Sequence, residues 1–238
     1  MKTIIHKADT RGHANHGWLN TYHTFSFSSY HNPERVHFGA LRVLNDDYVA
    51  AGMGFGKHPH DNMEIVTVPL TGALKHNDST GREKIIRKGE VQIMSAGKGI
   101  YHSEINASHD EAVTLLQIWV LPKERNIEPR YDQKEFGVEN RKNRIQTVVG
   151  PDQKEGALWI NQDSWFSLSD LDAGQEITYA LNKSGNGVYV FVIEGSANIE
   201  GQQLEKRDGI GISETDSILV KTSTGAELIF IEVPMQLN

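Results

Sequence analysis

The strongest constraint on the fold is a regular alternation of short β-rich segments with turns. Runs rich in apolar and β-branched residues recur along the chain, for example at 63–70, 112–121, 187–193 and 227–233, and turn-forming residues separate them. Long stretches with the apolar spacing of an amphipathic helix are absent from the sequence. This pattern predicts an all-β protein made of barrels or sandwiches.

The two halves of the chain form a degenerate repeat. The segment 66–73 matches 190–197, and 115–122 matches 228–234, although the offset between matching positions drifts along the chain. Between the halves, residues 123–144 are charged and poor in apolar residues. We therefore predict two β-barrel domains, at residues 1–122 and 145–238, joined by a linker at 123–144.

Composition excludes several classes of protein. The 238 residues include no cysteine, which rules out disulfides, thiolate metal sites and cysteine catalysis, and which fits a cytoplasmic location. A run of about 18 apolar residues is absent, so no membrane association is predicted, and the N-terminus lacks the apolar core of a signal peptide. The net charge of −7 argues against direct nucleic-acid binding but leaves protein partners open.

Two short motifs in the first half carry the chemistry. They are His58-Pro59-His60 and His102-Ser103-Glu104, and in each motif one residue separates the polar members. Residues two apart on a strand point to the same face, roughly 6.6 Å apart. Two such strands facing one cavity would place three imidazoles and a carboxylate around one point, which suits a divalent transition metal. All 11 histidines lie at or before His109, so we expect one metal per chain, held by the first domain.

The residue spacing does not decide which carboxylate is the fourth metal ligand. Glu64 lies four residues after His60 and would also face inward on an unbroken strand, so Glu64 and Glu104 are both candidates. Six histidines near the N-terminus do not form close pairs with a second ligand at strand spacing, and we predict that they are surface or hydrogen-bonded side chains: His6, His13, His16, His23, His31 and His37. We predict that His76 and His109 are turn or surface residues.

One acidic run has the chemistry of a turn. Asn45-Asp46-Asp47 follows an apolar segment and precedes another. Asparagine and aspartate favour turns because their side chains hydrogen-bond to the nearby backbone. We therefore predict two strands here, at 36–43 and 48–52, separated by this turn.

Together these motifs resemble those of a known superfamily, the cupins. The resemblance is carried by residues at the two cupin motifs: Gly52, His58, His60, Glu64, Gly72, Gly89, Gly99, His102 and Asn106. The spacing from Gly89 to Gly99 and a missing proline in the second motif depart from the cupin pattern. The closer resemblance is to the pirin family, through His58-Pro59-His60 and the segments 75–79 and 92–104, and it covers residues 9–122 well.

The resemblance implies a fold and a function. Pirins are bicupins, with two tandem cupin (double-stranded β-helix, or jelly-roll) barrels and one metal site in the N-terminal barrel. In this chain the metal ligands would be His58, His60, His102 and Glu104, with Glu64 beside them. Some pirins have quercetin 2,3-dioxygenase activity, whereas others act as transcriptional co-regulators. We expect a metal-dependent dioxygenase that cleaves flavonols such as quercetin with O₂, and the alternative is a metal-containing regulatory or sensor protein that binds a protein partner.

The number of protein ligands makes some candidate metals more suitable than others. Three histidines and a carboxylate would already close a tetrahedral zinc site, whereas a six-coordinate metal keeps two positions open for substrate oxygens or O₂. Our order is iron first, then copper, nickel or manganese, and then zinc. Glu104 or Glu64 could take the proton of a flavonol 3-hydroxyl. Candidate walls for a flat aromatic substrate are Phe25, Phe27, Tyr30, Phe38, Met53, Phe55, Met63 and Met94.

Overall fold

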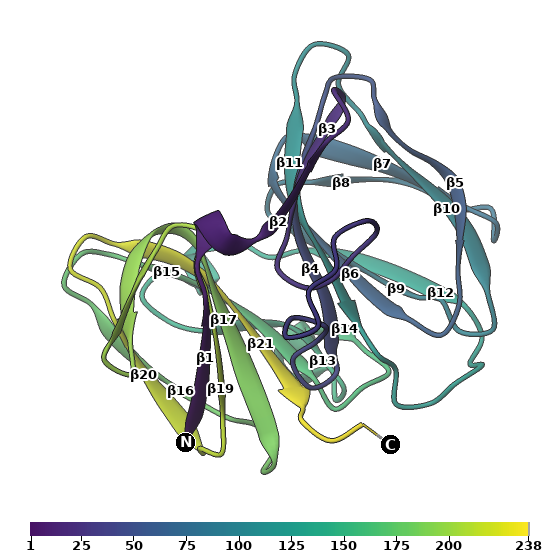
Figure 1. The fold of residues 1–238 in the computed structure, drawn as a ribbon. Coiled ribbons are helices and arrows are strands. Elements are labelled where there is room, and N and C mark those ends of the chain that lie inside the picture. Colours follow the sequence, from purple (N-terminus) through teal and green to yellow (C-terminus); the bar gives the residue numbers. More distant parts are fainter. Residues whose placement is uncertain (238) are drawn as a thin grey trace.

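The structure is a computed structural model that describes residues 1–237, and it confirms the all-β prediction (Figure 1). Within this range the helical segments are three short 3₁₀ turns: η1 (Ala8–Thr10), η2 (Val138–Asn140) and η3 (Lys154–Gly156). The described residues include no helix with the length and apolar character that a membrane span requires.

Two sheets form the N-terminal barrel. The seven-stranded sheet has the order β12 (Arg130–Glu135), β9 (Glu90–Ser95), β6 (Glu64–Thr71), β11 (Val113–Val120), β4 (Leu41–Val49), β3 (Leu19–His23) and β2 (Gly12–Asn15). The four-stranded sheet has the order β5 (Gly54–His60), β10 (Ile100–Asn106), β7 (Ala73–Asp78) and β8 (Glu83–Arg87). Figure 1 shows these two sheets facing each other around one interior.

A ten-stranded sheet forms the C-terminal barrel. Seven of its strands follow the order β1 (Lys2–His6), β19 (Gly209–Ser213), β17 (Asn186–Ile199), β21 (Ala226–Pro234), β15 (Trp165–Leu171), β13 (Gln146–Gly150) and β14 (Leu158–Trp159). The remaining three are β16 (Glu176–Ala180), β18 (Gln202–Glu205) and β20 (Ser217–Lys221). The long strand β17 pairs with β19 and β21 in its first part and with β18 and β20 in its second.

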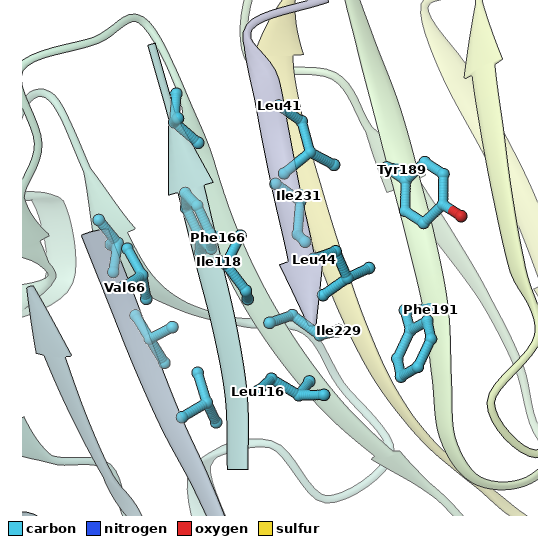
Figure 2. Packing of buried hydrophobic residues seen from close by; sticks show 14 of the residues in the cluster. Leu41, Leu44, Val66, Leu116, Ile118, Phe166, Tyr189, Phe191, Ile229 and Ile231 are labelled. Carbon is cyan, nitrogen blue, oxygen red and sulfur yellow. The ribbon is translucent and has the colours of Figure 1, made fainter. Parts of the chain in front are cut away.

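The barrels meet across a continuous apolar layer. Leu44 on β4 and Ile118 on β11 come from the first barrel, and Phe166 on β15 and Ile229 on β21 come from the second (Figure 2). All four side chains are buried. The part of the outer face of the seven-stranded sheet that packs in this layer is therefore apolar.

Strand pairing departs from the predicted domain boundaries in two places. Strand β1 pairs with β19, so the first residues complete the C-terminal barrel. Strand β12, inside the predicted linker, pairs along its whole length with β9. It has few apolar residues because an edge strand needs little inward anchoring, and Tyr131 packs against Met94 and Ile65.

The predicted turn at Asn45-Asp46-Asp47 is wrong, because β4 runs unbroken through these residues. Asn45 and Asp47 line the interior cavity, while Asp46 on the other face lies 3.3 Å from Arg11 and 3.4 Å from Arg207. Val49, which follows on the same face, is buried in an apolar cluster, so only part of the inner face is polar. Three consecutive polar residues inside the strand, Asn45-Asp46-Asp47, are what made it look like a turn.

Candidate metal centre

Strands β5 and β10 bring the three predicted histidines together. His58 pairs with His102, and His60 pairs with Ile100 two residues further along the paired strands. One ring nitrogen from each of His58, His60 and His102 lies within 4.8 Å of the other two. The ring centroids are 4.4 Å apart for His58 and His102 and 4.8 Å apart for His60 and His102. The predicted strand alternation is therefore confirmed for β10, on which His102 and Glu104 are both buried.

A close contact between β5 and β10 depends on glycine. A Cβ on Gly54 would come within 2.2 Å of the Glu104 carbonyl oxygen. The strand register also shifts between His102 and Glu104, where three residues of β5 pass two of β10. The bulge keeps Phe55, His58 and His60 on the half-buried side of β5 although their spacing is not uniformly two.

The histidines present lone pairs rather than charge. The Nδ1–H of His58 donates to the Gly56 carbonyl oxygen at 2.7 Å, which leaves Nε2 as the acceptor nitrogen. Burial lowers the pKa of His60 to about 4, and His58 beside it adds to the effect. Burial, with His58 and His60 nearby, lowers the pKa of His102 to about 2. Neutral imidazoles are the form that binds a metal.

Glu104 lies beside the histidines and is oriented by the seven-stranded sheet. Its Oε2 accepts a hydrogen bond from Gln117 Nε2 at 2.8 Å, and the hydroxyl of Thr67 lies 3.5 Å from Oε1. Burial raises the pKa of Glu104 to about 7. A carboxylate oxygen of Glu104 lies within 4.8 Å of a ring nitrogen of His102 and of His76, a second grouping that shares His102 with the first. A cation at this position would favour the charged carboxylate.

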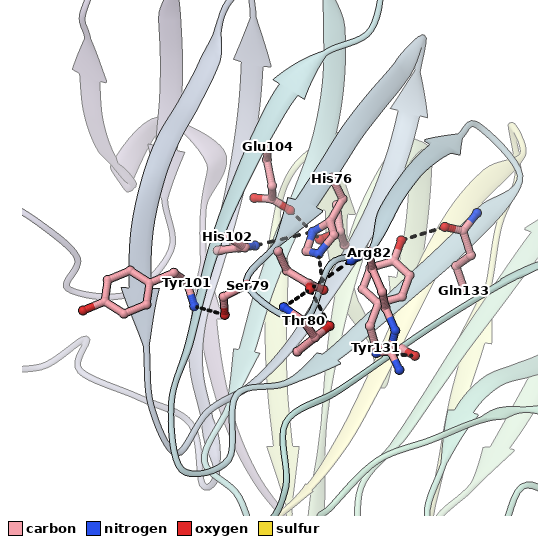
Figure 3. Close-up of polar contacts among 11 residues, drawn as sticks. His76, Ser79, Thr80, Arg82, Tyr101, His102, Glu104, Tyr131 and Gln133 are labelled. Carbon is pink, nitrogen blue, oxygen red and sulfur yellow. Dashed lines mark hydrogen bonds and ion pairs between the residues drawn. The ribbon is translucent and has the colours of Figure 1, made fainter.

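His76 and Asp78 complete a buried chain that the sequence analysis missed. His76 Nε2 lies 3.1 Å from Asp78 Oδ2, and His76 Nδ1 lies 3.5 Å from His102 Nδ1 (Figure 3). The Asp78 carboxylate accepts from the backbone N–H of Thr80 at 2.8 Å. With its proton toward Asp78, His76 accepts the Nδ1–H of His102, and Nε2 of His102 becomes the lone-pair nitrogen.

The prediction that His76 is a turn or surface residue is therefore wrong. His76 is fully buried on β7, opposite Glu104, and Asp78 is opposite His102. The signal was present in the sequence, because Leu74, His76 and Asp78 repeat the two-residue spacing of the ligand motifs. It was overlooked because a hairpin tip was expected to be exposed.

Glu64 is not part of this cluster and does not line the cavity beside the histidines. Strand β5 ends at His60 and β6 begins at Glu64, and Asn62 between them has a φ of 45°. The same-face argument required an unbroken strand, and the turn removes that condition. Glu64 Oε2 accepts from the Ser95 hydroxyl at 2.8 Å and from the backbone N–H of Asn161 at 3.1 Å. Its role is to connect the two barrels.

A cavity of about 250 Å³ opens beside the histidines. His58, His60 and Glu104 line one side of it. Two predicted wall residues, Phe27 and Phe55, also line it, and Trp119 joins them as a wall residue that was not predicted. The other six candidates do not line it. Phe25 and Phe38 are in the layer between the barrels, Met63 and Met94 belong to a separate apolar cluster, Met53 is exposed, and Tyr30 also lies outside the lining.

The C-terminal barrel has a different interior. Its inside is filled by apolar side chains such as Val188, Val190 and Phe230. Within residues 1–237, both groupings that could hold a metal ion lie in the N-terminal barrel. Two tandem barrels, of which one carries a histidine cluster, define the bicupin class.

Comparison with known proteins identifies the branch of this class. The pirin family model matches residues 5–120, and a model for the quercetinase C-terminal cupin domain matches residues 147–233. A quercetin 2,3-dioxygenase from Escherichia coli strain K12 is 41% identical over 234 residues, which cover 97% of this chain and 98% of that protein. A pirin-like protein from Caulobacter vibrioides is 39% identical over 225 residues, with coverage of 94% and 96%.

The structural comparison agrees with the sequence comparison. The crystal structure of the bacterial pirin YhhW from Escherichia coli, in complex with nickel(II), superposes with a TM-score of 0.93 at 39% identity. The match covers 98% of this chain and 99% of that chain. The chain belongs to the pirin family.

Proposed function

We propose that this protein is a metal-dependent dioxygenase that cleaves flavonols such as quercetin with O₂. The observation that carries the proposal is the cluster of three imidazoles, two of which line a cavity with aromatic walls. Relatives named quercetin 2,3-dioxygenase at 41% identity support the same reaction class.

His58, His60, His102 and Glu104 would hold one divalent transition metal. The donor set fits, because His102 Nε2 is buried and has no hydrogen-bond partner in residues 1–237, while His58 Nε2 is left as an acceptor. Iron is our first choice, followed by copper, nickel, manganese and zinc, and the nickel complex of YhhW supports a divalent ion in this family. Such a metal would supply Lewis-acid and redox chemistry toward a chelating enol and O₂.

Side chains of the protein would accept the proton of the substrate hydroxyl and would contact the aromatic ring of the substrate. Glu104 is the base that would take the proton of the flavonol 3-hydroxyl, since its carboxylate lies beside the histidines and lines the cavity. Gln117 holds that carboxylate in place at 2.8 Å. Trp119 stands edge-on to His60, with ring centroids 4.9 Å apart, and with Phe27 and Phe55 it would flank a flat substrate and exclude water.

Oxygen uptake with quercetin tests the proposal. Protein reconstituted with each candidate metal is compared with a His58→Ala variant and with a His31→Ala control, since His31 is exposed and lies outside the cluster. We expect the parent and His31→Ala to consume oxygen at similar rates, and His58→Ala to be slower by about 100-fold or more. Equal rates for His58→Ala and the parent would contradict the proposal. If none of the proteins consumes oxygen, a regulatory protein with a protein partner becomes the better hypothesis.

A further inference from the structure

The cavity has a polar floor on the seven-stranded sheet. Strands β3 and β4 pair so that Thr21 lies opposite Asp47 and His23 lies opposite Asn45. All four side chains are buried, and all four line the cavity that also contains His58, His60 and Glu104. Four polar side chains of two adjacent strands are thus gathered on one inner face.

Each of these four side chains has a buried polar atom without a hydrogen-bond partner in residues 1–237, including Oγ1 of Thr21. Both ring nitrogens of His23, Oδ1 of Asn45 and Oδ1 of Asp47 are buried and form no hydrogen bond within the described part of the chain. Leaving such a group unpaired costs about 1–3 kcal/mol. Several in one place are expected only where another molecule supplies the partners. The cavity in front of them is where that molecule would lie.

The floor is continuous with the support of the candidate metal centre. Asn45 on β4 pairs with Gln117 on β11, the residue that holds Glu104, and Gln117 pairs with Thr67 on β6. Thr67 in turn pairs with Gln92 on β9. A single polar row therefore crosses the sheet, with the cavity above one end of it. Gln92 belongs to the same row and is buried with both amide atoms unpaired by residues 1–237, but it lies outside the cavity lining.

We propose that His23, Asn45 and Asp47 form a subsite that binds the phenolic hydroxyls of a polyhydroxylated aromatic substrate. The inference rests on the flavonol reaction proposed above and adds a substrate class, polyphenols with hydroxyls away from the chelating oxygens. Those hydroxyls both donate and accept, so they can pair with an imidazole, an amide and a carboxyl together. The chelating end of the same molecule faces His58 and His60.

Equilibrium binding without turnover tests the subsite. Anaerobic protein loaded with nickel(II), the ion in the YhhW complex, is titrated with quercetin and with 3-hydroxyflavone, because no turnover can follow binding when O₂ is absent. Both ligands carry the same 3-hydroxy-4-keto chelating group, but 3-hydroxyflavone lacks the hydroxyls of the outer rings. The variants are Asn45→Leu and Asp47→Leu, and Gln92→Leu is the matched control from the same row. Metal content and thermal unfolding are measured for each protein.

The informative quantity is the preference for quercetin, the ratio of the two dissociation constants. We expect this ratio to fall by about tenfold in Asn45→Leu and in Asp47→Leu, and to stay within about twofold of the parent in Gln92→Leu. Two independent positions keep the test intact if one variant does not fold.

Two results would overturn the subsite while leaving flavonol chelation standing. One is an unchanged ratio in both cavity variants, and the other is an equal fall in the Gln92→Leu control. If the nickel-loaded parent binds neither ligand, the flavonol proposal itself fails and the subsite fails with it.

Discussion

The two barrels bury their carboxylates in opposite ways. In the C-terminal barrel, Glu232 accepts hydrogen bonds from the Tyr179 hydroxyl, from the backbone and side-chain amides of Asn182, and from Lys183 and Asn186, all at 2.9–3.1 Å. In the N-terminal barrel, Glu104 is held by Gln117 and Thr67 and faces imidazoles that are themselves acceptors.

This difference separates a structural carboxylate from one poised for a ligand. Glu232 satisfies the chain around it, beside a barrel interior that is filled with apolar side chains. Glu104 stands at a cavity whose polar groups still require partners. One fold therefore supports both a packed barrel and a reactive one, and the side chains that point inward decide which it becomes.

The largest expected effect is on Glu232. Glu232→Ala leaves several buried donors without an acceptor, so we expect the free energy of unfolding to fall by about 3–5 kcal/mol. Denaturant unfolding measures the loss, and metal content per folded chain should not change. Unchanged stability would show that Glu232 is not structural.

Glu104→Gln is expected to show the opposite pattern. The amide keeps an acceptor for Gln117, so the stability of the metal-free protein should change by less than about 1 kcal/mol. Affinity for a divalent metal, measured by competition with a chelator, should fall by about 100-fold or more, because a charged ligand is lost. A large loss of stability with intact metal binding would remove the proposed contrast between the barrels.

Glu64, which connects the barrels, is expected to make stability depend on pH. Burial raises its pKa from 4.5 to about 7, so the folded protein holds the proton more tightly than the unfolded chain does. Its contribution to stability is fully present below pH 4.5 and declines as the pH rises to about 7, by up to about 3 kcal/mol.

Glu64→Gln should remove this dependence. Relative to the parent, the variant should be more stable at pH 8 than at pH 5, as measured by calorimetry on both proteins in the same metal state. Because other titrating groups are common to both proteins, the difference isolates Glu64. A difference that does not vary with pH would show that Glu64 is charged in the folded protein at all of these pH values.

The smallest expected effect concerns His76. His76→Phe keeps an aromatic ring at this position but removes the acceptor for the Nδ1–H of His102, so metal affinity should fall by about 10- to 100-fold. The visible spectrum of cobalt-substituted protein should also change, because the orientation of His102 is altered. Asp78→Asn retains an acceptor for His76 and should have a smaller effect. Parent-like affinity and spectrum in His76→Phe would exclude a positioning role.

The sequence predicted the features that depend only on the local alternation of residues along a strand. Turn spacing predicted the all-β fold, and the two-residue spacing of His58/His60 and His102/Glu104 predicted their common inner faces. These features need only strand geometry, which residues two apart always share. The choice between Glu64 and Glu104 needed more, because one turn residue, Asn62, determines the face on which Glu64 emerges.

Tertiary structure decided which face of each strand is inside and what that inside contains. Asn45 and Asp47 look like a turn until the second barrel covers the outer face of β4 and makes the cavity its inner face. His76 and Asp78 become a buried support for His102 only when β7 pairs with β10. Strand β1 likewise belongs to the C-terminal barrel because it pairs with β19, which is more than 200 residues away along the chain. Such assignments depend on long-range pairing and on which surfaces are covered, and neither is written in local sequence periodicity.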